Sequence, residues 1–398
     1  MLRRSLLTSA IAASLLTTFS LPAFATQVYE TDLVIIGGGL SGLAAAQSAV
    51  DQGAKPIVLE KEAALGGGGN FPEGSLGVGT RYQKEHNINT TVDQVLTAAL
   101  QYHHYRADPH VLRVLIEESG KTIDWVMDKG AQMRGIRTMY PKDESLMTWH
   151  LFKGGAAGII QRFAKEVRAK GGTILTETPA KKLIVENGKV VGVEAVDGEG
   201  EKVIVKAKKV IIATGGFADN PEMMKKYTRF PNTDGIAQTG KNGVGIQMAW
   251  SAGGGKEGLE VQQSYRPGPR AVSTTNHVSA TAKQPHLWLT PNGERFCDET
   301  IMGDWPAAGN ALERIGGQMW VVYDNKNLDS MKHDGIVQGV GVMVPIGAKL
   351  TNFEKEWPAA EQAGWAVKAN TLDELAKKTG MDPAVLKASV EQYNKAAE

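Results

Sequence analysis

The sequence predicts a mixed α/β protein with two domains, one built on parallel strands joined to an antiparallel β-meander and one an inserted α+β domain. Short β-branched runs alternate with helical patterns near the N-terminus, which is typical of parallel βαβ units. Farther along, short strand patterns follow one another with turn dipeptides between them, which is typical of a meander. A chain of 398 residues also exceeds the usual size of one domain.

The composition is that of a globular protein. Hydrophobic residues make up 42% of the chain and charged residues 22%, which excludes wholesale disorder and a multi-span membrane protein. The 44 basic residues nearly balance the 43 acidic ones, so no nucleic-acid partner is expected. The single cysteine, Cys297, allows no intramolecular disulfide. The 46 glycines exceed the usual share of about 7% and indicate tight backbone turns beside ligands.

Residues 1–25 have the pattern of a targeting segment. Arg3 and Arg4 open it, no charge follows up to Ala25, and Ala23-Phe24-Ala25 is a small-x-small cleavage site. We expect cleavage near Ala25, a periplasmic or otherwise exported mature chain, and no stable membrane span. The paired arginines are compatible with a twin-arginine route and equally with ordinary secretion.

The first domain opens with a βαβ pattern. The run 32–36 predicts a buried strand that stops at a glycine turn, and 41–51 predicts a helix ended by Gly53. A second strand over 56–59 ends in Glu60. A glycine cluster at 66–69 follows, and then helical patterns over 91–130 and 158–170.

Residues 172–211 change in character and predict the meander. Its turns are Asn187-Gly188 and Gly198–Gly200, and its strands are expected at 173–176, 182–185, 190–193 and 203–205. A separate buried parallel strand is expected at 209–213, and a helical ending over 371–397. We therefore expect a sheet domain over 26–249, an inserted domain over 250–368 and a return to the sheet domain over 369–398.

A glycine fingerprint lies between the first strand and the first helix. Gly37, Gly39 and Gly42 have the spacing in which one glycine makes a tight turn, one admits a pyrophosphate and one packs helix against strand. The helix N-terminus supplies an anion site, and Glu60 can bind ribose hydroxyls. Together they predict a Rossmann-like dinucleotide site, against the alternative of a structural glycine turn.

Several motifs together carry a family resemblance. The chain resembles the FAD-dependent fumarate reductase/succinate dehydrogenase flavoproteins, nearest to the soluble exported branch that reduces fumarate, urocanate and related enoates. The matching segments, in order, are Asp32–Gly42, Glu60-Lys61, Gly68-Gly69-Asn70, the meander, Ala213–Phe217, Gly293–Phe296 with Glu299, and Leu372–Asn394.

The resemblance implies non-covalent FAD in a Rossmann-like FAD-binding domain, with the inserted domain as a cap over the substrate. Glu60 and Lys61 would lie at the adenosine ribose. The remaining expected cofactor contacts are Gly37, Gly39 and Gly42 at the pyrophosphate, Gly68, Gly69 and Asn70 near the flavin, and Ala213, Thr214 and Gly215 near the adenosine half.

The reaction that the resemblance implies is hydride transfer between flavin and the C=C bond of a small unsaturated organic acid, as in anaerobic respiration. Arg295 and Glu299 are the expected catalytic residues, with Lys326 in place of a proton-donating arginine. The sequence departs from the family at further points. Residues 262–266 contain no carboxylate-binding histidine, and Gly303 stands where a proton-relay arginine is expected. The substrate is therefore not expected to be fumarate itself.

Two other functions stay open at this point. The ketosteroid dehydrogenases share the Arg-Phe-x-x-Glu region, so a desaturase is an alternative, and a flavin-binding paralogue without catalysis is another. No Cys-x-x-Cys-His motif is present, so we expect no covalent haem and no metal site, and electrons from a separate cytochrome or flavoprotein. The resemblance also implies that relatives continue past Tyr393-Asn394 with a strand and helix that contact the flavin.

Overall fold

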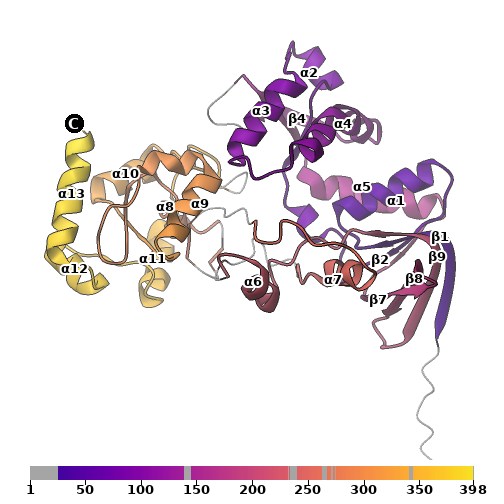
Figure 1. The fold of residues 1–398 in the computed structure, drawn as a ribbon. Coiled ribbons are helices and arrows are strands. Elements are labelled where there is room, and N and C mark those ends of the chain that lie inside the picture. Colours follow the sequence, from indigo (N-terminus) through magenta and orange to yellow (C-terminus); the bar gives the residue numbers. More distant parts are fainter. Residues whose placement is uncertain are drawn as a thin grey trace, which may run out of the picture.

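The computed structural model describes residues 26–397 except 139–144, 232, 234–239, 262–266, 270–271, 274 and 340–343, so the expected targeting segment lies outside the described residues. Figure 1 shows a large sheet with helices α1 and α5 at one end of the molecule and helices α8 to α13 at the other, here called the sheet lobe and the second lobe. No helix within the described ranges is both long and apolar enough to cross a bilayer.

The sheet lobe is built on six strands in the order β6-β2-β1-β9-β8-β7. The pairs β6-β2, β2-β1 and β1-β9 are parallel, and β9, β8 and β7 form the expected antiparallel meander. The bounds are β1 Gln27–Ile36, β2 Ile57–Leu59, β6 Thr173–Leu175, β7 Ala180–Glu186, β8 Lys189–Val196 and β9 Lys202–Ile212.

Two strand expectations are corrected. Residues 173–175 belong to the parallel sheet and not to the meander, because they pair with β2 from Ile57 to Leu59. The strands expected at 203–205 and 209–213 are one continuous strand, β9. Its first half pairs with β8, and its whole length pairs with β1, which extends back to Gln27.

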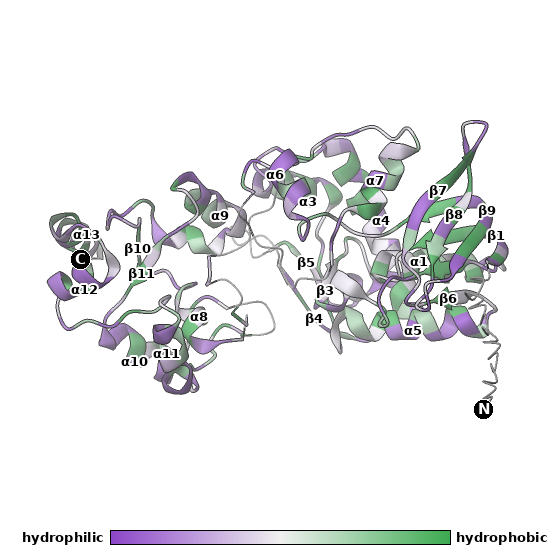
Figure 2. Ribbon diagram, turned by 90° about the horizontal axis from the view of Figure 1, so that it is seen from below, coloured by the Kyte–Doolittle hydropathy of each residue, from purple (hydrophilic) through white to green (hydrophobic). Residues whose placement is uncertain are grey.

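Alternating side chains of β1 build a core on each face of the sheet. Val34 and Ile36 pack with the meander and with Met248 of α7 (Val244–Ser251). Ile35 packs on the other face with Ala46 and Val50 of α1 (Leu40–Asp51), and Val167 of α5 (Gly155–Ala169) joins this cluster. In Figure 2 hydrophobic colours gather on these strands.

A smaller sheet and three helices extend the sheet lobe. The sheet has the order β3-β5-β4, with β3 Gly74–Leu76, β4 Met133–Thr138 and β5 Met147–Phe152. Helices α2 (Arg81–Glu85) and α3 (Val92–Tyr102) each begin with a threonine capping box, and α4 (Pro109–Asp128) begins at an Asp108 cap. The helix expected over 91–130 is thus two helices, separated where His104 and Tyr105 take positive φ. Helix α6 (Pro221–Tyr227) follows β9.

The second lobe contains a two-stranded ribbon, β10 (Leu287–Leu289) and β11 (Trp320–Val322), surrounded by helices. The helices are α8 His277–Thr281, α9 Trp305–Arg314, α10 Asn325–His333, α11 Phe353–Gln362, α12 Leu372–Thr379 and α13 Pro383–Ala397, with a 3₁₀ helix over Glu299–Gly303.

The stretch 369–398 was expected to return to the sheet domain, but its helices α12 and α13 pack in the second lobe. Ala376 of α12 and Leu386 of α13 share a core with Leu287 and Leu289 of β10. The helical pattern was predicted correctly, but the apolar faces of both helices are buried against the ribbon. Helix α7 belongs to the sheet lobe, since Met248 packs on the meander.

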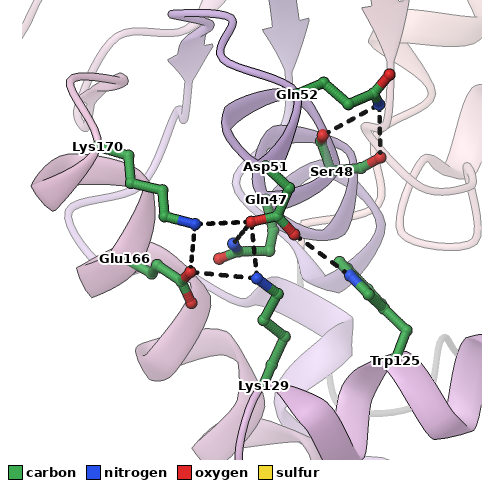
Figure 3. Close-up of polar contacts among 8 residues, drawn as sticks. All are labelled: Gln47, Ser48, Asp51, Gln52, Trp125, Lys129, Glu166 and Lys170. Atoms are coloured by element: carbon green, nitrogen blue, oxygen red, sulfur yellow. Dashed lines mark hydrogen bonds and ion pairs between the residues drawn. The ribbon is translucent and has the colours of Figure 1, made fainter.

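A charged cluster fastens α1 to α4 and α5 (Figure 3). The carboxylate of Asp51 at the end of α1 accepts hydrogen bonds from Lys129 at 2.7 Å, Lys170 at 2.8 Å and Trp125 at 3.3 Å. Both lysines also contact Glu166 of α5. Burial alone would raise the pKa of Asp51, but hydrogen bonds from Lys129 and Lys170 outweigh it and hold that pKa well below its usual value.

Replacing Lys129 with methionine is expected to lower the free energy of unfolding at pH 7 by about 1 to 2 kcal/mol, between the values for exposed and buried ion pairs. A carboxylate whose pKa is lower in the folded state than in the unfolded state stabilises the fold at pH values above its unfolded pKa. This stabilisation is lost as the pH falls through the folded pKa. The variant should therefore lose less stability than the wild type on acidification below about pH 4. Urea unfolding at pH 7 and pH 3 measures both effects. Lys170→Met, at a more exposed lysine, is the control and should cost less.

Candidate functional site

The turn after β1 leaves no space for side chains. Gly37 has φ +110°, and a Cβ there would overlap the carbonyl oxygen of Ala213. A Cβ at Gly42 would overlap the carbonyl oxygen of Gly37. Both positions therefore require glycine, and the backbone of the turn lies open beside the start of α1.

Helix α1 presents an uncapped N-terminus at this turn. Its N-cap residue, Gly39, has no side chain, and the first turn contains no acidic residue. The free backbone N–H groups and the positive end of the helix dipole favour a bound anion here.

The glycine cluster lies against the same helix end. The N–H of Gly66 donates to the carbonyl of Gly38 at 3.0 Å. A Cβ at Gly69 would lie 2.9 Å from the amide nitrogen of Leu40. Asn70 closes the 3₁₀ turn η1 (Gly67–Asn70) through a 3.1 Å hydrogen bond to the carbonyl of Leu65. We call the surface formed by residues 37–42 and 66–70 the glycine cradle.

Glu60 lies at the edge of the glycine cradle, at the end of β2. It is buried, and its Oε2 accepts a 2.7 Å hydrogen bond from the N–H of Gly38. Its Oε1 accepts from the N–H of Glu62 at 2.9 Å. Lys61, next along the chain, forms an ion pair with Glu62. The structure thus brings Glu60 to the cradle, while a cofactor contact by Lys61 stays a prediction.

Residues 213–215 form the remaining wall. The N–H of Ala213 donates to the carbonyl of Ile36 at 2.8 Å, and Gly215 has φ +75°. Thr214 and Gly215 also border a cavity of 380 Å³ on the α7 side. Further residues line it, among them Ile246, Ala249, Trp250 and Lys256.

The α7 wall of this cavity was not among the expected site residues. The Lys256 ammonium lies 4.2 Å from the centre of the Trp250 ring. The glycine repeat at Gly243 and Gly245, at the start of an apolar helix, is the signal that could have indicated it. At Gly245 a Cβ would overlap Thr214, so the close packing of α7 on the site wall requires glycine.

These residues fit an adenine dinucleotide. A glycine-rich backbone cradle suits a pyrophosphate, and the uncapped helix end supplies N–H donors to it. A buried carboxylate at the end of the second strand suits ribose hydroxyls. The expected glycines, Glu60, Asn70 and Ala213 thus lie around the turn after β1 and the start of α1, and their contacts with the cofactor stay predictions.

Glu60→Gln is expected to weaken FAD binding about 10- to 100-fold, because a charged hydrogen-bond acceptor contributes roughly 1.5 to 3 kcal/mol. Flavin fluorescence titration of the desalted protein measures the dissociation constant. Glu62→Gln is the matched control, since Glu62 is exposed and should leave binding unchanged. Equal retention of FAD by Glu60→Gln and the wild type would contradict the ribose assignment.

The expected catalytic residues Arg295 and Glu299 form an ion pair with each other in the second lobe. The Arg295 guanidinium donates to Glu299 through Nη2 at 2.6 Å and Nε at 3.0 Å. Glu299 also accepts from the N–H of Trp288 in β10 at 3.1 Å, and its side chain is only 4% exposed. The Glu299 carboxylate raises the pKa of Arg295. This geometry makes the pair a support for β10, and a catalytic role stays a prediction.

The other two second-lobe residues singled out in the sequence lie apart from the glycine cradle. Lys326 is exposed near the start of α10, at the opposite end of the molecule from α1 (Figure 1). Burial raises the pKa of the Cys297 thiol to about 11, and the side chain packs against the Trp288 cluster. Among the described residues no group of His, Cys, Asp and Glu is arranged to hold a metal ion.

Comparison with known proteins gives a family model described as FAD binding domain, which matches residues 32–398. The chain is 33% identical to vinyl phenol reductase of Lactiplantibacillus plantarum, over 91% of this chain and 76% of that protein. It is 27% identical to NADH:fumarate oxidoreductase of Klebsiella pneumoniae, over 92% of this chain but only 37% of that protein. It is 25% identical to urocanate reductase of Eggerthella lenta, over 92% of this chain and 59% of that protein.

Two solved structures share the fold. An open conformation of a flavocytochrome c3 fumarate reductase has a TM-score of 0.64 at 22% identity, over 92% of this chain and 61% of that chain. A 3-ketosteroid-Δ4-(5α)-dehydrogenase from Rhodococcus jostii has a TM-score of 0.69 at 20% identity, over 93% and 77%. With the glycine cradle and Glu60 in place, the chain belongs to the FAD-dependent fumarate reductase family and carries its FAD binding domain.

Proposed function

We propose that this chain is part of an FAD-dependent reductase that saturates the C=C bond of a small unsaturated organic molecule. The observation that carries the proposal is the glycine cradle at the uncapped end of α1, with Glu60 beside it. FAD, when bound, supplies the hydride chemistry of such a reaction. The protein then has to hold the cofactor, orient the alkene and deliver a proton.

Each part of the sheet lobe has a distinct task in this proposal. The start of α1 and the backbone of residues 37–42 would bind the pyrophosphate, and Glu60 the adenosine ribose. Residues 66–70 would face the flavin half. The second lobe would cap the site and exclude water, which strengthens every polar contact to the alkene.

The substrate class follows from what the sequence lacks. A dicarboxylate substrate needs cationic side chains for both carboxylates, and the carboxylate-binding histidine expected for that task is absent from 262–266. A vinyl phenol has no carboxylate and does not need this histidine. The 33% identity to vinyl phenol reductase supports the same direction. We therefore propose a vinyl phenol or a monocarboxylic enoate ahead of fumarate.

Reoxidation of the reduced flavin tests this proposal. The FAD-loaded protein is photoreduced without oxygen and mixed with vinyl phenol, acrylate, urocanate or fumarate, and the return of the oxidised flavin bands is followed. We expect vinyl phenol or a monocarboxylate to restore the bands faster than fumarate. Bleaching of the oxidised flavin by a saturated ketosteroid would instead favour a dehydrogenase. No response to any compound would favour a non-catalytic flavin-binding protein.

Export and a separate electron donor complete the proposal. Arg3, Arg4 and Ala23–Ala25 support cleavage of the leader near Ala25, and the absence of a haem-attachment motif supports donation by a cytochrome or flavoprotein. The intact mass of the protein from a periplasmic extract should match a chain that begins at Thr26. Recovery of the unprocessed chain from the cytoplasm would contradict export.

A further inference from the structure

His150 is a buried histidine that the proposed function does not use. It lies on β5 with no exposed surface. Its Nδ1 lies 3.0 Å from the carbonyl oxygen of Thr148, and its Nε2 lies 2.8 Å from the hydroxyl of Thr80. A carbonyl can only accept, so Nδ1 carries the proton and Nε2 accepts from Thr80. In its neutral form the ring is thereby held in one tautomer and one orientation.

The ring of His150 packs directly on the backbone of residues 74–80. The N–H of Gly77 donates to the same Thr148 carbonyl at 2.9 Å. A Cβ at Gly77 would lie 2.8 Å from the imidazole Cε1, and one at Gly74 would overlap the carbonyl oxygen of His150. Both positions therefore require glycine because β5 lies so close, and residues 74 and 77 pack directly against His150.

Residues 71–73 join the glycine cradle to the segment 74–80. In this link the carbonyl of Pro72 accepts from the N–H of Ala156 at 2.9 Å, and the carbonyl of Glu73 accepts from the N–H of Phe152 at 2.9 Å. The Ile160 side chain of α5 lies 3.3 Å from the position of a Cβ at Gly69. The end of β5 and the start of α5 therefore hold the chain from the cradle as far as Thr80.

We infer that His150 is a positioning residue of the FAD site. Held between Thr148 and Thr80, it fixes the segment 74–80 and so anchors the C-terminal end of the loop that forms half of the glycine cradle. This inference rests on the proposed FAD site and adds to it a residue that touches neither cofactor nor substrate.

The arrangement has a consequence for pH. Burial lowers the pKa of His150 below its usual value, so the neutral ring persists into mildly acidic solution. Protonation would turn Nε2 into a donor, and the Thr80 hydroxyl would have to turn towards Gln83 Oε1 at 3.4 Å. The other titratable groups beside this site are Tyr82 at a ring distance of 6.0 Å, His86 stacked on Tyr82, and Asp124 paired with Arg81.

Four variants of the full chain test the inference. His150→Leu should raise the FAD dissociation constant about tenfold, the effect of one buried hydrogen bond. Thr80→Val also removes the cap of α2 and should raise it at least as much. Thr80→Ser keeps the hydroxyl and should restore wild-type binding. Thr281→Val is the matched control, because Thr281 is an equally buried, hydrogen-bonded threonine in the second lobe. It should lower stability and leave FAD binding unchanged.

Two further readouts separate positioning from general destabilisation. FAD retention by the wild type should fall at acidic pH. In His150→Leu, FAD retention should depend less on pH than it does in the wild type. Hydrogen–deuterium exchange of a peptide covering 71–85, measured without FAD, should speed up in Thr80→Val and stay unchanged in Thr281→Val. Failure of the wild type to retain FAD would refute the proposed function, and the exchange comparison would still decide the anchoring role.

Two results would overturn the inference. One is a wild-type dissociation constant and pH profile in folded His150→Leu. The other is an equal loss of FAD binding in Thr281→Val, which would assign the effect to stability alone.

Discussion

Gly42→Ala is expected to abolish FAD retention while leaving the rest of the chain folded. A Cβ at residue 42 would overlap the carbonyl oxygen of Gly37. The Cβ position is fixed by the backbone and the oxygen is a backbone atom, so no side-chain rotation can relieve the overlap. Helix α1 would have to move away from β1, which displaces the N–H donors of the anion site. We expect the dissociation constant for FAD to rise at least about 100-fold, since displaced donors each cost roughly 1.5 to 3 kcal/mol.

Gly158→Ala is the control for this variant. Gly158 is exposed within α5, and a Cβ there would meet nothing within 4 Å. Alanine at a helical position stabilises by about 0.5 to 1 kcal/mol, so this variant should bind FAD normally and melt slightly later. Both variants are compared by flavin fluorescence titration and by circular dichroism. Normal FAD retention in Gly42→Ala would contradict the glycine cradle as the pyrophosphate site.

Arg295→Met is expected to destabilise the second lobe by about 3 to 5 kcal/mol, because it leaves the Glu299 carboxylate buried without its partner. Arg295 supplies three hydrogen bonds to that carboxylate, at 2.6, 3.0 and 3.3 Å. The loss of the ion pair should also loosen β10, because the backbone N–H of Trp288 donates to Glu299. Differential scanning calorimetry measures the effect as a lower melting temperature of the second lobe.

The double variant Arg295→Met/Glu299→Leu separates support from catalysis. Replacing both members of a buried pair by apolar residues often restores stability, so we expect most of the loss to be recovered. Flavin reoxidation that is retained in the stable double variant would make the pair purely structural. Its disappearance at recovered stability would support the catalytic prediction for Arg295 and Glu299. An unchanged melting temperature in Arg295→Met would contradict the supporting role.

The glycine turn after β1 and the helix that follows it were predictable from sequence because their signals are local. A β-branched run, three spaced glycines, an alanine-rich helix and a strand-end acid lie within Asp32–Glu60, and each has a physical task that only that residue type performs. The structure brings Gly66–Asn70 and Ala213–Gly215 to the same place through contacts with Gly38 and Ile36. The sequence indicated these two segments through a family resemblance and not through spacing.

The errors concern partners that are distant in the chain. The run at 173–175 has strand character, but its pairing with β2 depends on the crossover through α5 and leaves no local mark. The apolar faces of α12 and α13 predict burial without saying against what, and they are buried on β10 and β11. Arg295 and Glu299 are four residues apart, yet their mutual pairing depends on the turn into the 3₁₀ helix. The periodicity of hydrophobic residues predicts whether a segment is a helix or a strand, but tertiary contacts determine where that segment packs.

The central claim is that this chain holds FAD in the glycine cradle. The most direct measurement is the visible absorption spectrum of the purified 398-residue chain after incubation with FAD and desalting. The structure predicts retained flavin bands in the wild type, reduced bands in Glu60→Gln and none in Gly42→Ala. A colourless wild-type protein, or equal bands in all three proteins, would contradict the claim.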